Sequence, residues 1–145
     1  MKKECFEDIL FKINSELINS NGLYLIHLLN NSKIINHVDF HRFEFIEMSL
    51  DKVIFNNVSF RGTFFVKTSF MECHFNNCSF ITAGLSETSF DNCKFNSCIF
   101  RFTDFNKCII RECIFKDIYF NDSFIEKLNM AGAQLINGNV FNYLS

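Results

Sequence analysis

Residues 53–80 read VIFNN VSFRG TFFVK TSFME CHFNN CSF, a unit of five residues that repeats without interruption. The third residue of every block is phenylalanine, and the first is small or β-branched. Stepping by five from Phe40 to Val140 meets 21 residues, of which 14 are phenylalanine and none is polar. A period of five fits neither the 3.6 of a helix nor the 2 of a plain strand, so it indicates short extended pieces joined by turns.

The repeat defines two columns of residues that face the same way. Alternate residues of an extended chain share one side, so the large residue points in the same direction as the small residue two positions earlier. From Val53 to Cys113 every residue of this second column is small or β-branched. The other three positions of each unit are rich in polar residues and are expected to face water. The pattern therefore predicts an all-β fold, a narrow tube filled by one large and one small column.

This pattern resembles the pentapeptide-repeat family, and the resemblance covers residues 36–140. It implies a right-handed quadrilateral β-helix in which four pentapeptides make one coil and residues 20 apart stack directly. Twenty-one repeats would then give about five coils, and a coil spacing of about 4.8 Å would make the tube roughly 25 Å long.

The outward positions test the count of four units per coil independently of the family. Like charges directly opposite each other across paired strands are destabilising, so stacked charges should alternate in sign. Among the expected stacks, only Lys107 against Lys127 breaks this rule. The stacks expected from an offset of 20 are Glu47, Lys67, Glu87 and Lys107; Lys52 and Glu72; Asp91 and Arg111; and an amide ladder of Asn56, Asn76 and Asn96.

Composition limits the kinds of partner. The chain has 145 residues and a formal net charge of −2, which suits one folded unit without a basic surface for phosphates. No apolar run approaches the ~20 residues that a membrane helix needs. We therefore expect no direct nucleic-acid binding and no membrane association.

The cysteines invite a metal or disulfide interpretation, but their spacing opposes it. Six of the seven lie in the small inward column, five or more residues apart on different walls of the tube, whereas zinc sites use converging C-x₂₋₄-C pairs. Stacked cysteines have parallel Cβ vectors, which do not suit the torsion of a disulfide. We expect reduced, space-filling thiols and no metal site. Together with the lack of a signal peptide, this predicts a cytoplasmic protein.

Nothing in the sequence indicates catalysis. The four histidines are scattered, and no phosphate-binding or nucleophile motif is present. A filled tube also lacks the concave pocket that most catalysis requires. We expect no enzyme activity and no cofactor.

Residues 1–35 are predicted to be an N-terminal capping segment, because they are out of phase with the five-residue repeat. Residues 36–145 are predicted to form the β-helix and a short C-terminal tail. Apolar residues at helical spacing predict an amphipathic helix over residues 3–19. A turn at Asn21-Gly22 follows, and residues 23–29 are compatible with strand or helix. The helix serves either as a lid over the first coil or as a binding site for a partner.

The C-terminal coils carry a candidate interaction surface, because the position before the large residue changes there from polar to apolar. Strand propensity alone is the alternative explanation. The apolar tail either folds over the last coil or joins two copies end to end, and a homodimer through the C-terminal coils is the simplest assembly. The candidate residues are Ile99, Phe102, Ile109, Ile114, Tyr119, Phe124, Phe141, Tyr143 and Leu144.

Two functions fit these features. The first is a non-enzymatic protein-binding or scaffold module whose partner the sequence does not identify. The second follows from the resemblance alone: some pentapeptide-repeat proteins are acidic mimics of DNA that bind DNA gyrase and give resistance to quinolones or immunity to gyrase-directed peptides. Residues 36–140 carry 12 acidic and ten basic residues, a balance that weakens this second hypothesis.

Overall fold

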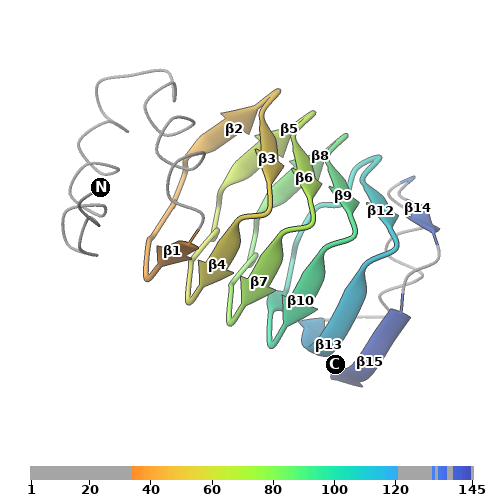
Figure 1. Ribbon diagram of the computed structural model, residues 1–145. Helices are drawn as coiled ribbons and strands as arrows, with labels where there is room; N and C mark the ends of the chain where they lie inside the picture. The colour runs from red at the N-terminus through yellow and green to blue at the C-terminus, as the bar shows by residue number, and fades with distance from the viewer. Residues whose placement is uncertain (1–33, 121–131, 133, 137–138, 145) are drawn as a thin grey trace.

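A computed structural model describes residues 34–120, 132, 134–136 and 139–144 of the chain as a β-solenoid of about four turns (Figure 1). The predicted helix over residues 3–19, the turn at Asn21-Gly22 and the segment 23–29 lie outside the described residues. Among the residues described, no helix is long and apolar enough to span a membrane.

All described elements are strands, and most are three residues long because each pentapeptide contributes one short strand. They are β1 (Ile34–Asn36), β2 (Glu44–Ile46), β3 (Ser49–Asp51), β4 (Ile54–Asn56), β5 (Phe64–Val66), β6 (Ser69–Met71), β7 (His74–Asn76), β8 (Gly84–Ser86), β9 (Ser89–Asp91), β10 (Lys94–Asn96), β11 (Ile99–Phe100), β12 (Ile109–Arg111), β13 (Ile114–Phe120), β14 (Gln134–Ile136) and β15 (Asn139–Leu144).

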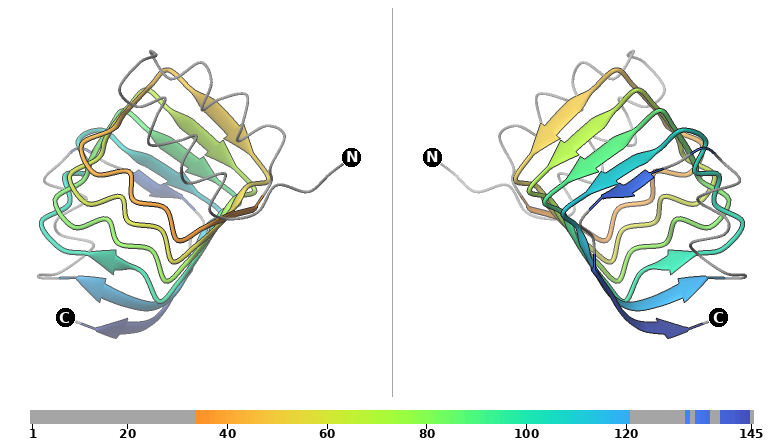
Figure 2. Two further views of the ribbon diagram at one scale, coloured as in Figure 1. Left: turned by 90° about the vertical axis from the view of Figure 1, so that its left-hand side faces the viewer. Right: turned by 90° about the vertical axis from the view of Figure 1, so that its right-hand side faces the viewer.

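The strands stack in parallel on four walls, which give the coils their four-sided outline (Figure 2). Wall 1 contains β1, β4, β7, β10 and the first half of β13, and wall 4 contains β3, β6, β9, β12 and β14. Wall 3 contains β2, β5 and β8. Wall 2 contains β11, the end of β13 and the bridge-paired residues Asp39, Ser59 and Ser79. Partners on every wall are 20 residues apart up to Phe120, which confirms the predicted stacking.

The first coil begins two residues before the boundary expected from the sequence. Strand β1 starts at Ile34 and pairs with β4, and Ile35 is fully buried opposite Phe55. Isoleucine is large enough for the inward column, so Ile35 is one more step of the repeat before Phe40.

A left-handed backbone conformation at every corner bends the chain from one wall to the next. The second residue after each large inward residue has positive φ, and in the described residues 16 of these are not glycine, with φ between 49° and 61°. Gly62, at 68°, occupies the same position. This conformation is unfavourable for most residues but least so for asparagine, which explains the asparagine at corners such as Asn57, Asn77 and Asn92.

Stacked phenylalanine rings fill the tube. Phe95 lies between Phe75 and Phe115, with ring centroids 4.8 and 4.5 Å apart and ring planes within 6° of parallel. Rings on adjacent walls meet edge to face, as Phe75 and Phe90 do at 5.9 Å. All three rings of the Phe75–Phe95–Phe115 stack are at most 1% exposed. Phe95 is therefore held by identical neighbours above and below and by steeply inclined rings beside it.

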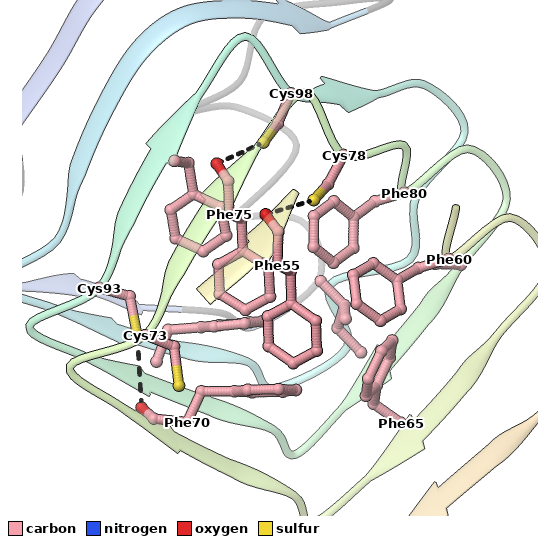
Figure 3. Close-up of a cluster of buried hydrophobic side chains, with 14 of the residues drawn as sticks. Phe55, Phe60, Phe65, Phe70, Cys73, Phe75, Cys78, Phe80, Cys93 and Cys98 are labelled. Atoms are coloured by element: carbon pink, nitrogen blue, oxygen red, sulfur yellow. Dashed lines mark hydrogen bonds between the residues drawn. The ribbon is translucent and has the colours of Figure 1, made fainter. Parts of the chain in front are cut away.

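The small inward column supplies hydrogen-bond donors as well as small volume. The Thr63 hydroxyl donates to the carbonyl oxygen of Phe40 at 2.8 Å, and the Cys98 thiol donates to that of Phe75 at 3.2 Å. Figure 3 shows the thiols of Cys78, Cys93 and Cys98 directed at the carbonyl oxygens of Phe55, Phe70 and Phe75. Cysteine and threonine therefore share one role, and the expectation that the cysteines only fill space was incomplete. The same bond, from a residue to the carbonyl 23 positions earlier, is made by Thr68, Cys73, Cys78, Cys93, Thr103 and Cys113.

The cysteines in the described residues are all free and buried. Burial raises the pKa of the Cys98 and Cys108 thiols. Hydrogen bonds with the Cys113 and Cys73 thiols, followed by burial, raise the pKa of Cys93. These three thiols are therefore neutral in the folded protein at physiological pH, which is the state in which a thiol can donate to a carbonyl.

Side chains outside the tube form two of the stacks predicted from the 20-residue offset, the asparagine ladder and the Asp91–Arg111 pair. On wall 1, Asn56 donates to Asn36 at 2.9 Å, Asn76 to Asn56 at 2.9 Å and Asn96 to Asn76 at 3.2 Å. On wall 4, Arg111 forms an ion pair with Asp91 at 2.9 Å. The ladder and the ion pair confirm the register independently of the core.

The stacking offset changes after Phe120. Ile110 pairs with Leu135 and Phe115 with Val140, so partners are 25 residues apart. A Cβ atom placed on Gly132 would lie 3.9 Å from Cγ of Lys107, which puts Gly132 at the position expected for Lys127. Lys127 itself lies outside the described residues, so its expected stack with Lys107 stays a prediction, and one additional pentapeptide separates the last strands from those above them.

We predict that Phe95→Ala lowers the free energy of unfolding by about 3–5 kcal/mol, because stacked neighbours hold the tube open around the missing ring. Phe95→Leu is the control, since Leu85 occupies the same column fully buried, and it should cost less. Urea unfolding followed by circular dichroism measures both. A Phe95→Ala midpoint equal to that of the wild type would contradict the stacked core.

We also predict that the stability contributed by the neutral Cys98 and Cys108 thiols is lost above about pH 8.5, the usual pKa of an unfolded thiol. A folded pKa that is raised favours the folded state fully below the unfolded value, and this contribution is lost as the pH rises above it. The double variant Cys98→Thr, Cys108→Thr places a neutral hydroxyl in the same column, as at Thr103. Its unfolding free energy should fall less steeply between pH 8 and pH 10. Equal slopes would show that the thiols do not contribute.

Candidate protein-interaction surface

Three of the nine candidate residues lie on wall 2 near its C-terminal end. Ile99 of β11 pairs directly with Tyr119 of β13, and both side chains point outward because Phe100 and Phe120 point inward. Tyr119 is 38% exposed. Phe102 lies at the corner that follows Phe100. We call Ile99, Phe102 and Tyr119 the wall 2 cluster.

Phe102 is unfavourably placed in two respects. Its ring is 65% exposed, the highest value among the large hydrophobic residues that the structure describes. Its backbone has φ of 54°, in the left-handed region that bulky residues avoid. The equivalent corners nearby carry Asn92, Ser97 and Lys107. Backbone strain concentrates at functional sites, so Phe102 marks this corner as a candidate site.

Two further candidates lie on other walls. Ile114 is 37% exposed on wall 1, where it stacks against Lys94. Ile109 is half-buried on wall 4, between Ser89 and Gln134. The structure therefore does not bring Ile109 and Ile114 together with the wall 2 cluster.

The C-terminal tail adds a strand to the same end of the solenoid. Strand β15 pairs with β13, so that Phe141 is opposite Lys116, Tyr143 opposite Ile118 and Leu144 opposite Tyr119. Of the two alternatives left open by the sequence, this pairing is the one in which the tail folds onto its own last coil (Figure 1). Phe124 lies outside the described residues.

A second apolar group lies on wall 3 and was missed by the sequence analysis. Ile46 is 50% exposed and pairs with Val66, and Phe64 on the neighbouring coil is 53% exposed. A Cβ atom on Gly84 would lie 3.2 Å from the Phe64 ring, so the ring covers that glycine. Ile46 and Val66 occupy the position after the large inward residue. The sequence analysis followed the change from polar to apolar residues only at the position before the large residue.

The described residues contain no cluster of three metal-ligating side chains, and every buried side-chain nitrogen or oxygen among them has a hydrogen-bond partner. The imidazole Nδ1 of His41 lies 3.0 Å from the carbonyl oxygen of Arg61 on wall 2. What this part of the chain offers a partner is therefore a set of flat outer walls with exposed apolar and charged side chains.

Comparison with known proteins agrees with the fold. The family model for pentapeptide repeats matches residues 73–112 with eight copies. No curated protein matches the chain. The structure is similar to that of QnrB1, a plasmid-mediated fluoroquinolone resistance protein, with 21% sequence identity and a TM-score of 0.57 over 79% of this chain. The match covers 56% of the QnrB1 chain, and at this identity it establishes the fold alone.

A second similar structure is the pentapeptide-repeat protein Rfr23 from the cyanobacterium Cyanothece 51142. It is 8% identical, with a TM-score of 0.50, and the match covers 86% of this chain and 97% of Rfr23. The five-residue period, the four-walled solenoid and the family match over residues 73–112 agree with one another: the chain carries pentapeptide repeats and has the fold of pentapeptide-repeat proteins.

Proposed function

We propose that this chain is a non-enzymatic protein-binding or scaffold module that contacts its partner through the wall 2 cluster. Phe102 carries this proposal, since a large, exposed ring at a strained corner has a cost to folding that a binding role explains. Exposed aromatic residues are also the side chains that most often dominate the energy of protein interfaces.

The stiffness of the solenoid supports this function. Backbone hydrogen bonds connect each coil to the next, for example from Thr82 N to Arg101 O at 3.0 Å and from Tyr119 N to Cys98 O at 3.1 Å. Side chains held on such a wall are already positioned for a partner. Binding then has a smaller entropy cost than it would on a flexible loop.

A second copy of the chain is the simplest partner. Leu144 is placed next to Tyr119 by backbone pairing, so the C-terminal strand lies beside the wall 2 cluster. Most soluble oligomers are symmetric homo-oligomers, in which one patch contacts itself. A homodimer through the C-terminal coils would cover Tyr119 and Phe102 together.

We also propose that the protein is located in the cytoplasm, where free thiols stay reduced.

A DNA-mimicking protein that binds DNA gyrase is the second candidate function, favoured by the likeness to QnrB1. The charges oppose it. Arg111 neutralises Asp91 at 2.9 Å on wall 4, and wall 2 carries Arg61 and Arg101 among its exposed side chains. A mimic of DNA requires an extended surface of one negative sign.

We predict that Phe102→Asn raises the free energy of unfolding by roughly 1 kcal/mol, because asparagine tolerates the left-handed corner, and that it weakens self-association. Urea unfolding and light scattering measure the two effects. Asn92→Phe is the matched control at another corner, with φ of 54°, and should lose stability without changing association. If Phe102→Asn instead lost several kcal/mol, Phe102 would be a packing residue and the proposal would fail.

We predict that the full chain at micromolar concentration neither inhibits nor protects gyrase in a supercoiling assay, because no wall presents an unbroken negative field over residues 34–120. QnrB1 is the positive control for the fold. Inhibition or protection that weakens with added salt would favour the gyrase function over the scaffold function.

A further inference from the structure

Exposed cationic side chains gather on wall 2, the wall that carries the proposed binding cluster. On this wall, the residue that directly follows the large inward residue points outward. From the first coil to the fourth, these residues are His41, Arg61, Ile81 and Arg101. The backbone bonds from Gly62 N to Ile81 O and from Thr82 N to Arg101 O place these residues above one another. Arg42 lies at the corner of the first coil.

These arginines have no carboxylate partner among the described residues. The only carboxylate on the described part of wall 2 is Asp39, and its Oδ1 accepts the backbone N–H of His41 at 3.0 Å. On wall 4, by contrast, Arg111 is paired with Asp91 at 2.9 Å. Within residues 34–120, wall 2 therefore presents exposed guanidinium groups with no carboxylate beside them.

The cations are also separated from the acidic residues around the tube. Each corner residue is counted here with the wall that it ends. Between residues 34 and 120, walls 3 and 4 together carry eight acidic and four basic side chains. Walls 1 and 2 together carry two acidic and five basic side chains. Because positive and negative charges alternate along individual stacks, this difference in net charge between the two pairs of walls is not evident from any single stack. Wall 2 is the side on which an anionic partner meets the least repulsion.

Apolar side chains lie between and beside the arginines. Ile81 is half-buried and separates Arg61 from Arg101, and the wall 2 cluster continues the same face with Ile99 and Tyr119. Phosphates alone would make no use of these aliphatic groups. An acidic polypeptide with apolar residues among its carboxylates would contact both kinds of side chain.

The spacing favours a helix over an extended strand as that polypeptide. Two coils separate Arg61 from Arg101 by about 9.6 Å, from a spacing of ~4.8 Å per coil. On one face of a helix, residues separated by seven positions lie about 10.5 Å apart, which matches the distance from Arg61 to Arg101. Residues separated by three or four positions lie about 5–6 Å apart, so the residue between the two carboxylates would be level with Ile81. Same-face residues of a strand recur every ~6.8 Å and match neither interval.

We propose that wall 2 binds an acidic amphipathic helix of a partner protein, laid along the solenoid axis, with carboxylates at Arg61 and Arg101 and apolar residues at Ile81 and the wall 2 cluster. This inference rests on the proposed protein-binding function and specifies the chemistry of a partner other than a second copy of the chain, one that would compete with self-association at the wall 2 cluster. A nucleic acid is disfavoured because the whole chain has a net charge of −2 and the neighbouring wall 3 is acidic.

The test is selection of a phage-displayed library of random 16-residue peptides on the immobilised full chain. Selected peptides should be acidic, with apolar residues three or four positions from the carboxylates. Fluorescence anisotropy with the most enriched peptide should give at least tenfold weaker binding to Arg61→Gln, Arg101→Gln, and several-fold weaker binding in 500 mM than in 50 mM NaCl. The matched control is Lys94→Gln, Lys116→Gln on wall 1, which removes the same charge and should bind as the wild type does.

Three outcomes would overturn the inference. The first is that the selected peptides show no excess of acidic residues. The second is that the arginine variant binds the peptide as tightly as the wild type does. The third is that a labelled 20-nucleotide single strand, and not the peptides, binds through Arg61 and Arg101. The variant Ile99→Lys, Tyr119→Lys separates the two proposals. If it abolishes peptide binding while the arginine variant does not, wall 2 is a binding site and only the charge inference fails. If neither variant changes binding, the proposed function of wall 2 fails as well.

Discussion

Stacking of phenylalanine on phenylalanine is the interaction on which the other features of this solenoid depend. Parallel strands are about 4.8 Å apart, and the rings of Phe75, Phe95 and Phe115 stack at 4.5–4.8 Å, so one residue type fits its own copy in the next coil. That match keeps the inward column in phase. The phase in turn places a left-handed corner two residues later and an outward ladder residue beside it. The strain at the corners is tolerated because each coil is held by the coils on both sides.

The small column adds a polar condition to the packing. Cys98 and Thr63 are small enough to leave room for the rings and also donate to a carbonyl oxygen of the preceding coil, whereas Val53, Val58 and Ala83 meet only the size requirement. Threonine and cysteine meet both conditions. Hydrophobicity scales count cysteine as apolar, so the sequence indicated the size requirement but not the shared donor. The hydrogen bond becomes evident only when the residue 23 positions earlier is known to be a neighbour.

Features that depend on the local period could be predicted from the sequence, and features that depend on how coils or walls add together could not. The asparagine ladder and the Asp91–Arg111 pair follow directly from an offset of 20 residues. The change to an offset of 25 before Leu135 leaves the period of five intact, so the pattern of large residues contains no trace of it. Ile109, Ile114 and Tyr119 form one sequence column, but successive members of that column lie on different walls. The sequence therefore joined residues that the fold separates, and it missed Ile46 and Val66, which the fold brings together.

The exterior carries the information about function because the fold constrains it so little. Inward positions must be large or small, and corners must tolerate positive φ, but the remaining outward positions need only be soluble. An outward residue that works against the fold therefore needs a cause other than the fold. Phe102 is such a residue, since asparagine or glycine at its corner would remove the strain and the exposed ring together. Arg61 and Arg101 are a second case, because the fold does not require arginine at either position and neither has a carboxylate partner among the described residues. Both departures lie on wall 2, and a single binding face accounts for them with one cause.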